Sequence, residues 1–113
     1  MKSTADHIAI LVDDLSEAEK WYTDNLSGSV VFRDNKYVRF KIANTCIALI
    51  DKKHYPYAHT GILVNDVKDL PVEKGELVEH RDGTLGVYVK DPFGNYLEYI
   101  WYSPEQRREF LDD

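Results

Sequence analysis

The sequence predicts an α+β fold built from two βαβββ modules related by a pseudo-twofold axis. The segment His7–Leu15 recurs as His59–Val67 at a constant offset of 52 residues, with five of nine positions identical. Each copy is an apolar, strand-like run that ends near an aspartate, and further strand-like runs follow both copies. A module this small cannot bury both faces of its sheet, so we expect modules 5–52 and 57–102 to pack within one domain.

The first module begins with the apolar run at His7, and Asp14 is placed to cap a helix after it. Apolar side chains then recur at helical spacing and are expected to face the sheet: Leu15, Ala18, Trp21, Tyr22 and Leu26. Gly28 is expected to end this helix. Turn signals at Asp34-Asn35 and Ala43-Asn44 separate three predicted strands, Ser29–Arg33, Tyr37–Ile42 and Thr45–Ile50.

The second module repeats this order with a shorter helix. Asp66 is placed to open it, but Pro71 and Gly75 leave room for one or two turns only. The turn before the last strand, Asp91–Asn95, combines a proline that fixes φ with a glycine that supplies a positive φ. The predicted strands are Glu76–Glu79, Leu85–Val89 and Tyr96–Trp101, and a short helix or tail over 103–113 follows.

Composition and charge exclude several classes of function. The 14 Lys and Arg residues against 20 Asp and Glu give a formal charge of −6, so the chain offers no basic stripe for nucleic acid or an anionic membrane. No segment approaches the ~20 apolar residues of a membrane-spanning helix, and the first residues lack the apolar core of a signal peptide. With Cys46 as the single cysteine, we expect a cytoplasmic protein and assign that residue no role.

Three residues point to a metal site. His7 and His59 open equivalent strands of the two modules, and neutral imidazoles brought together in this way are natural metal ligands. Glu98 lies in a last strand rich in aromatic and aliphatic residues, where a buried carboxylate needs a compensating cation. That cation is a metal ion or, as the alternative, a side chain such as Arg39 or Arg81.

These residues are where the chain resembles the vicinal oxygen chelate superfamily, which includes glyoxalase I, methylmalonyl-CoA epimerase, extradiol dioxygenases, fosfomycin-resistance transferases and bleomycin-resistance proteins. The resemblance spans residues 5–102 and is most specific at Asp91-Pro92-Phe93-Gly94-Asn95-Tyr96-Leu97-Glu98, which is similar to the family's Asp-Pro-x-Gly-Asn-x-x-Glu signature. It implies a glyoxalase-like cup of mixed, curved sheets, a divalent cation held by His7, His59 and Glu98, and commonly a homodimer. A second chain would then cover sheet surface near Leu70 and Val72.

The family's fourth ligand, where present, lies in the last strand of the first module. Aligning Asn44 with Asn95 places Ile47 opposite Glu98, with Leu49 on the same face, and neither side chain can coordinate a metal. The pattern therefore fits the three-ligand members, whose two-His-one-carboxylate triad suits Fe²⁺, Mn²⁺, Ni²⁺ or Co²⁺, with Zn²⁺ as a further candidate.

Tyr88 and His80 are further residues to consider at this site. Tyr88, ten residues before Glu98, resembles the tyrosine that faces the substrate in extradiol dioxygenases and fosfomycin-type transferases, and packing its ring in the core is the alternative. His80 is interpreted as a solvated turn histidine, and the alternative is a resemblance to the acid–base histidine of extradiol dioxygenases, one residue away in the sequence.

The resemblance implies a metal-dependent enzyme acting on a small molecule that binds through two adjacent oxygens. Isomerase or lyase chemistry, dioxygenation and thiol transfer remain open, with Glu98 and Tyr88 as the catalytic candidates. A non-catalytic ligand-binding protein of the bleomycin-resistance type is the alternative, favoured by the short second helix. A partner-binding domain in which the metal only stabilises the fold is the third possibility.

Overall fold

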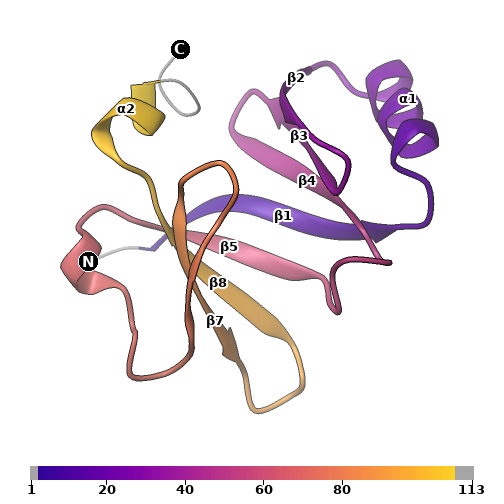
Figure 1. The fold of residues 1–113 in the computed structure, drawn as a ribbon. Coiled ribbons are helices and arrows are strands. Elements are labelled where there is room, and N and C mark those ends of the chain that lie inside the picture. The colour runs from indigo at the N-terminus through magenta and orange to yellow at the C-terminus, as the bar shows by residue number, and fades with distance from the viewer. Residues whose placement is uncertain (1–2, 109–113) are drawn as a thin grey trace. The chain divides into compact units, whose positions relative to one another are not determined.

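The fold is a mixed α+β architecture, seen in a computed structural model that describes residues 3–108 (Figure 1). The strands are hydrogen-bonded to their neighbours in the orders β2-β3-β4-β1 and β5-β8-β7-β6. The elements are β1 (Thr4–Val12), α1 (Leu15–Asn25), β2 (Ser29–Arg33), β3 (Tyr37–Ile42), β4 (Thr45–Asp51), β5 (His59–Val64), the 3₁₀-helix η1 (Val67–Asp69), β6 (Leu77–Glu79), β7 (Leu85–Lys90), β8 (Tyr96–Trp101) and α2 (Pro104–Gln106). The fold class predicted from the sequence is confirmed.

The chain divides into two compact units. The N-terminal unit comprises His7–Thr60, and the C-terminal unit combines the residues up to Asp6 with those from Gly61 onward. Each unit contributes four neighbouring strands, in the order β2-β3-β4-β1 and β5-β8-β7-β6. The sequence repeat matches β5 to β1, β6 to β2, β7 to β3 and β8 to β4. With this matching, the strand order of the C-terminal unit is the reverse of the strand order of the N-terminal unit.

Strand pairing in the N-terminal unit fixes which residues share a face. β1 runs parallel to β4 with His7 opposite Cys46 and Ile8 opposite Ile47, and β3 runs antiparallel to β4. Because successive strand residues point to opposite faces, His7 and Cys46 lie on one face and Ile8 and Ile47 on the other. The face of His7 continues into an apolar cluster whose buried members are Ala9, Ala48 and Ile50.

Helix α1 begins where the sequence predicts, because the Asp14 side chain accepts a hydrogen bond from the Glu17 backbone N–H at 3.0 Å. Tyr22 on this helix meets the fully buried Phe40 edge to face, with ring centroids 6.5 Å apart. The expectation that Trp21 also faces the sheet is wrong, since Trp21 is 58% exposed and its ring contacts Tyr22.

Gly28 has a different role from the predicted one. The helix ends at Asn25 with Leu26 as its cap, so Gly28 does not end it. A Cβ at Gly28 would overlap the carbonyl oxygen of Lys41 and the ring of Phe40. The glycine is therefore needed where the chain passes close to β3.

The C-terminal unit has the short helix that the sequence predicts. Asp66 caps the three-residue η1 through the Lys68 backbone N–H at 2.9 Å. The buried core of this unit includes Val64, Leu70 and Val87. Leu70 is only 5% exposed, so the expectation that it lies on poorly covered sheet surface is wrong, whereas Val72 is 55% exposed.

The Asp91–Asn95 turn sets the start of β8. The Asp91 carboxylate accepts hydrogen bonds from the backbone N–H groups of Phe93 at 2.8 Å and Asn95 at 2.9 Å. Gly94 has a φ of +91°, a conformation that L-residues rarely adopt. These contacts hold the turn that delivers Glu98, three residues beyond Asn95.

Helix α2 covers only part of the predicted C-terminal segment. Ser103 and Gln106 form a reciprocal capping box around its single turn. Residues 109–113 of the predicted tail lie outside the described residues. Within residues 3–108, no helix is long and apolar enough to cross a membrane.

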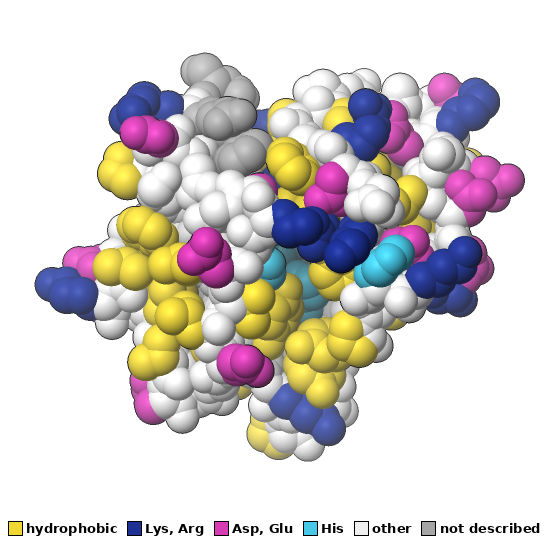
Figure 2. All heavy atoms as spheres, viewed as in Figure 1, with side chains coloured by type: hydrophobic (Ala, Val, Ile, Leu, Met, Phe, Trp, Pro, Cys, Tyr) yellow, Lys and Arg dark blue, Asp and Glu magenta, His cyan; other side chains and the backbone are white. Residues whose placement is uncertain are grey.

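Charged side chains of both signs lie on one face of the molecule. On the face drawn in Figure 2, lysine and arginine side chains are interspersed with aspartate and glutamate side chains. Ion pairs such as Lys20–Asp24 at 2.6 Å and Lys52–Asp13 at 2.6 Å join exposed residues of opposite sign. Exposed pairs of this kind contribute little to stability.

Candidate metal centre

The two repeat histidines are in direct contact. Nε2 of His7, in β1, lies 3.0 Å from Nε2 of His59, the first residue of β5, and the rings meet edge to face at 88°. His7 is 3% exposed and His59 is partly buried. Between neutral imidazoles, such a contact requires one Nε2–H to donate and the other Nε2 to accept.

The spacing of the two nitrogens fits a shared metal ion. Ligands that occupy neighbouring corners of an octahedron at the usual metal–imidazole bond length of about 2.1 Å are about 3.0 Å apart. The Nε2 atoms of His7 and His59 are separated by the same 3.0 Å. A divalent ion held by both nitrogens would take the place of the proton that they share.

Glu98 is the buried carboxylate that the sequence predicts. It lies in β8 opposite Tyr88 of β7, and only 2% of its surface is exposed. Removing an ionised carboxylate from water costs several kcal/mol unless a cation or a set of hydrogen bonds compensates. The burial of Glu98 therefore requires a partner that carries positive charge or donates hydrogen bonds.

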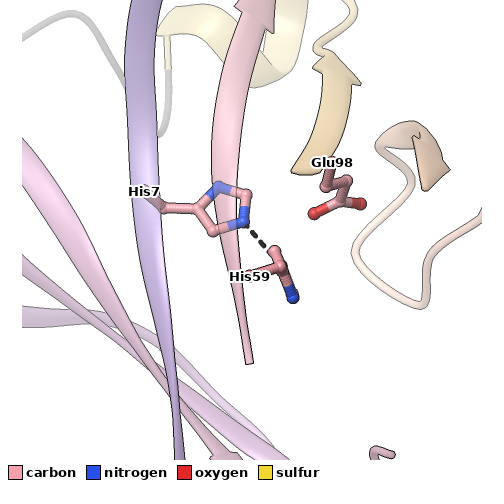
Figure 3. Close-up of side chains that lie close together, drawn as sticks. All are labelled: His7, His59 and Glu98. Atoms are coloured by element: carbon pink, nitrogen blue, oxygen red, sulfur yellow. Dashed lines mark hydrogen bonds between the residues drawn. The ribbon is translucent and has the colours of Figure 1, made fainter. Parts of the chain in front are cut away.

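The three predicted ligands could form a metal site. His7 and His59 of the N-terminal unit and Glu98 of the C-terminal unit each offer one ligand atom that a metal ion could use (Figure 3). A nitrogen–nitrogen–carboxylate donor set is the one found in facial-triad metal sites. The residues present therefore fit a divalent cation.

His80 is not the solvated turn residue that the sequence suggested. Its Nε2–H donates a short hydrogen bond to Oε2 of Glu98, and its side chain is 21% exposed. The alternative expectation gave Glu98 an arginine partner, Arg39 or Arg81, whereas the structure gives it a histidine 18 residues earlier in the chain. Arg39 is itself buried in β3, and Arg81 is exposed.

A glycine makes room for the His80–Glu98 contact. A Cβ at Gly86 would overlap Oε2 of Glu98 and lie 2.9 Å from Nε2 of His80. A glycine inside a strand often marks a close approach of another group. Gly86 lies in the predicted strand Leu85–Val89 and is the sequence signal that could have indicated this contact.

Tyr88 lies beside both members of this pair. It is directly opposite Glu98 in the antiparallel pairing of β7 and β8. Its ring meets the ring of His80 edge to face, with centroids 6.1 Å apart. Tyr88, His80 and Glu98 therefore form one cluster within the C-terminal unit.

The pairing of β1 with β4 corrects the predicted position of the fourth metal ligand. The alignment of Asn44 with Asn95 had placed Ile47 opposite Glu98, but β4 presents Cys46, not Ile47, beside His7. Cys46 also lies 52 residues before Glu98, the same offset that relates His7 to His59. The counterpart of Glu98 in the first module is therefore Cys46, which is 3% exposed and is not among the three grouped donors.

His54 and Arg107 lie in other surroundings. His54 Nδ1 contacts the Asp51 carboxylate at 3.3 Å on the surface of the N-terminal unit. The Arg107 guanidinium donates to Oδ1 of Asn65 at 3.3 Å. Both contacts account for these side chains without a role at the metal centre.

Solved structures of similar fold are distant in sequence. Methylmalonyl-CoA epimerase from Mycobacterium tuberculosis is 17% identical, with a TM-score of 0.71 over 93% of this chain and 91% of that chain. A hypothetical protein from Bacillus halodurans C-125 is 13% identical, with a TM-score of 0.72 over 91% and 96%. A glyoxalase/bleomycin resistance protein/dioxygenase superfamily member from Vibrio splendidus 12B01 is 12% identical, with a TM-score of 0.64 over 89% and 100%. At such identities these likenesses show the shared fold.

The sequence itself identifies the family. The family model that matches covers residues 4–99, which is most of the chain and includes all three candidate ligands. The chain belongs to the Glyoxalase/Bleomycin resistance protein/Dioxygenase superfamily.

Proposed function

We propose that the protein is a metal-dependent enzyme that binds a small substrate through two adjacent oxygen atoms. The observation that carries the proposal is the combination of two histidines at repeat-equivalent positions, with Nε2 atoms 3.0 Å apart, and a 98%-buried glutamate as the third donor. A core of this size gains no stability from a buried, charged glutamate, so its presence favours a functional reason.

The charge of the donor set supports the same proposal. Two neutral imidazoles and one carboxylate neutralise one unit of a divalent ion's charge, and the ion would add a cation to the hydrogen bond that His80 already donates to the buried Glu98. A divalent ion held in this way supplies Lewis acidity toward a carbonyl, enediolate or catecholate oxygen. Three protein donors leave neighbouring coordination positions for two oxygens of one ligand.

The chain's own residues would then bind and orient the substrate. Tyr88, opposite Glu98 in the strand pairing, is the candidate for a hydroxyl that hydrogen-bonds the bound substrate. Tyr96 and Ile100, two residues to either side of Glu98 in β8, share its face of the strand. Which small molecule is bound, and whether it is isomerised, oxygenated or attacked by a thiol, would follow from substrate screening of the metal-loaded protein.

A cobalt titration tests this proposal. The protein freed of metal and loaded with Co²⁺ should show visible absorption bands, which change on addition of acetohydroxamate, a ligand with two adjacent oxygens. Acetamide, which lacks the second oxygen, is the control and should leave the bands unchanged. Stoichiometric Co²⁺ binding with no response to millimolar acetohydroxamate would contradict the two-oxygen proposal, and failure to bind any ion would contradict the metal site.

A metal-free binding protein is the second candidate. It is favoured by the three-residue η1, because so short a helix leaves little chain to close over a bound substrate. Such a protein would take up no metal but would gain thermal stability with an aromatic or cationic ligand. A thermal-shift panel with and without a chelator separates the two functions.

A further inference from the structure

We propose that His80 is a positioning residue for the metal-binding carboxylate. By donating to Oε2 of Glu98, it leaves Oε1 as the oxygen that ligates the ion, so that Glu98 binds through one oxygen only. This inference rests on the proposed metal-dependent function and adds a residue that the three-ligand pattern does not contain.

The hydrogen bond defines which oxygen is available. The His80 Nε2–H contacts one carboxylate oxygen, and the carboxylate is 3% exposed, so water does not compete freely for that oxygen. A carboxylate held in this way cannot turn both oxygens toward one ion without losing the bond. One-oxygen ligation leaves one more coordination position for substrate than two-oxygen ligation would.

His80 is itself held in place by a closed turn. The His80 backbone N–H donates to the Thr84 carbonyl oxygen at 2.9 Å, and the Gly83 N–H donates to the His80 carbonyl oxygen at 2.9 Å. The Asp82 carboxylate accepts from the backbone N–H and the hydroxyl of the fully buried Thr84. The turn that carries His80 therefore has its backbone groups paired at both ends.

The C-terminal helix supports this turn from outside. Gln106, a member of the capping box of α2, donates from Nε2 to the carbonyl oxygen of Asp82. The ring of Tyr88 also meets the His80 ring edge to face. His80 is thus fixed by its turn, by α2 and by an aromatic neighbour, as expected of a group that orients a ligand.

Substitution of Gly86 provides a second, independent test of the proposal. The atoms that a Cβ at this position would meet are the ends of two side chains, Oε2 of Glu98 and Nε2 of His80. An alanine there would displace these side chains while leaving the strand backbone in place. Gly86→Ala should therefore separate His80 from Glu98 without removing either residue.

The test is the dissociation constant for Co²⁺ or Mn²⁺, measured by competition with a chromophoric chelator. Loss of a partner that orients a metal ligand typically weakens metal binding by about 10–100-fold, which is the loss expected for His80→Ala. Gly86→Ala should also weaken binding. His80→Gln, whose amide can donate from a similar position, should restore most of the affinity, a rescue that a purely structural role does not predict.

A matched control removes a histidine that lies elsewhere. His54→Ala eliminates an exposed histidine bound to Asp51 and should leave the dissociation constant unchanged. Circular dichroism of each metal-free variant shows whether it folds. If the wild type binds the ion and His80→Ala binds it within twofold, the positioning role is refuted and the metal site stands. If the wild type binds none, the proposed function itself fails, and this inference with it.

Discussion

Cys46 lies directly opposite His7 where β4 runs parallel to β1. The 52-residue step that carries His7 to His59 also carries Cys46 to Glu98. The two modules therefore place a histidine and a neighbouring residue of the last strand in the same relationship, but only the second module has a carboxylate there. At the position that corresponds to Glu98 in the first module, this chain therefore has a cysteine and not a carboxylate.

Restoring a carboxylate at this position should strengthen metal binding. We predict that Cys46→Glu lowers the stability of the metal-free protein, because it buries an extra charge at a site that is 3% exposed. Metal should then raise the melting temperature of Cys46→Glu by more than that of the wild type. Cys46→Gln, of the same size but uncharged, is the control, and an equal metal-induced shift in both variants would contradict the assignment.

The buried Asp6–Tyr102 pair should contribute measurably to stability. The Tyr102 hydroxyl, on a fully buried side chain, donates to Oδ2 of Asp6 at 2.7 Å. Tyr102→Phe removes a donor from a buried carboxylate and should cost about 1–3 kcal/mol of unfolding free energy, measured by urea denaturation. The same substitution at the partly buried Tyr99 controls for loss of a hydroxyl, and equal effects would argue against the importance of the pair.

The turn before β8 should require its glycine for backbone reasons alone. Gly94 has a φ of +91°, and a Cβ built there meets nothing within 4 Å. Gly94→Ala should therefore cost about 1–2 kcal/mol through backbone strain without any clash. Gly94→Asn, which tolerates positive φ better, should cost less by the same urea measurement. A larger cost for asparagine than for alanine would point to a side-chain effect.

The same turn predicts a pH dependence. Hydrogen bonds from the Asn95 backbone, and from Phe93, hold the pKa of the Asp91 carboxyl below its ordinary value of 3.8. A lowered pKa in the folded state means that ionised Asp91 stabilises the fold above that ordinary value, and that this stabilisation is lost as the pH falls through the folded-state pKa.

The measurement is the melting temperature of Asp91→Ala against the wild type from pH 7 downward. The variant should melt lower at pH 7, and the two curves should converge at the acid end of the range. A difference that stays constant down to pH 2 would show that the charge of Asp91 is not involved.

The strands and turns of the fold could be predicted because their signals are local. The strands Ser29–Arg33, Tyr37–Ile42 and Tyr96–Trp101 have the predicted bounds, since alternating apolar residues and turn residues determine both ends. The repeat brought His7 and His59 together correctly, because equal offsets place residues at equivalent positions of paired strands.

The residue of β4 that corresponds to Glu98 could not be identified from the turns in the sequence. The turn before β4 has two residues, Ala43 and Asn44, whereas the turn before β8 has five, Asp91–Asn95. Matching Asn44 to Asn95 therefore shifted the alignment by one residue, and a one-residue shift moves every side chain of a strand to the other face. The pairing of β1 with β4 was needed to identify Cys46.

The role of His80 depends on a contact between distant residues. The segment around His80, Glu79-His80-Arg81-Asp82-Gly83, is polar, and this polarity predicts a solvated turn. In the folded chain, however, His80 contacts Glu98, which lies 18 positions later. Only Gly86, the second residue of β7, indicated that approach. The burial of Leu70 is similar, because its cover comes from Val64 and Val87 on β5 and β7.

The most direct test of the metal centre is the metal content of the protein after equilibrium dialysis against Fe²⁺, Mn²⁺, Ni²⁺, Co²⁺ or Zn²⁺, each measured separately by elemental analysis. The account predicts one equivalent of a divalent ion for the wild type and for His54→Ala, and less than a tenth of an equivalent for His59→Ala. Absence of every ion from the wild type, or equal metal content in His59→Ala, would contradict the central claim that His7, His59 and Glu98 hold the ion.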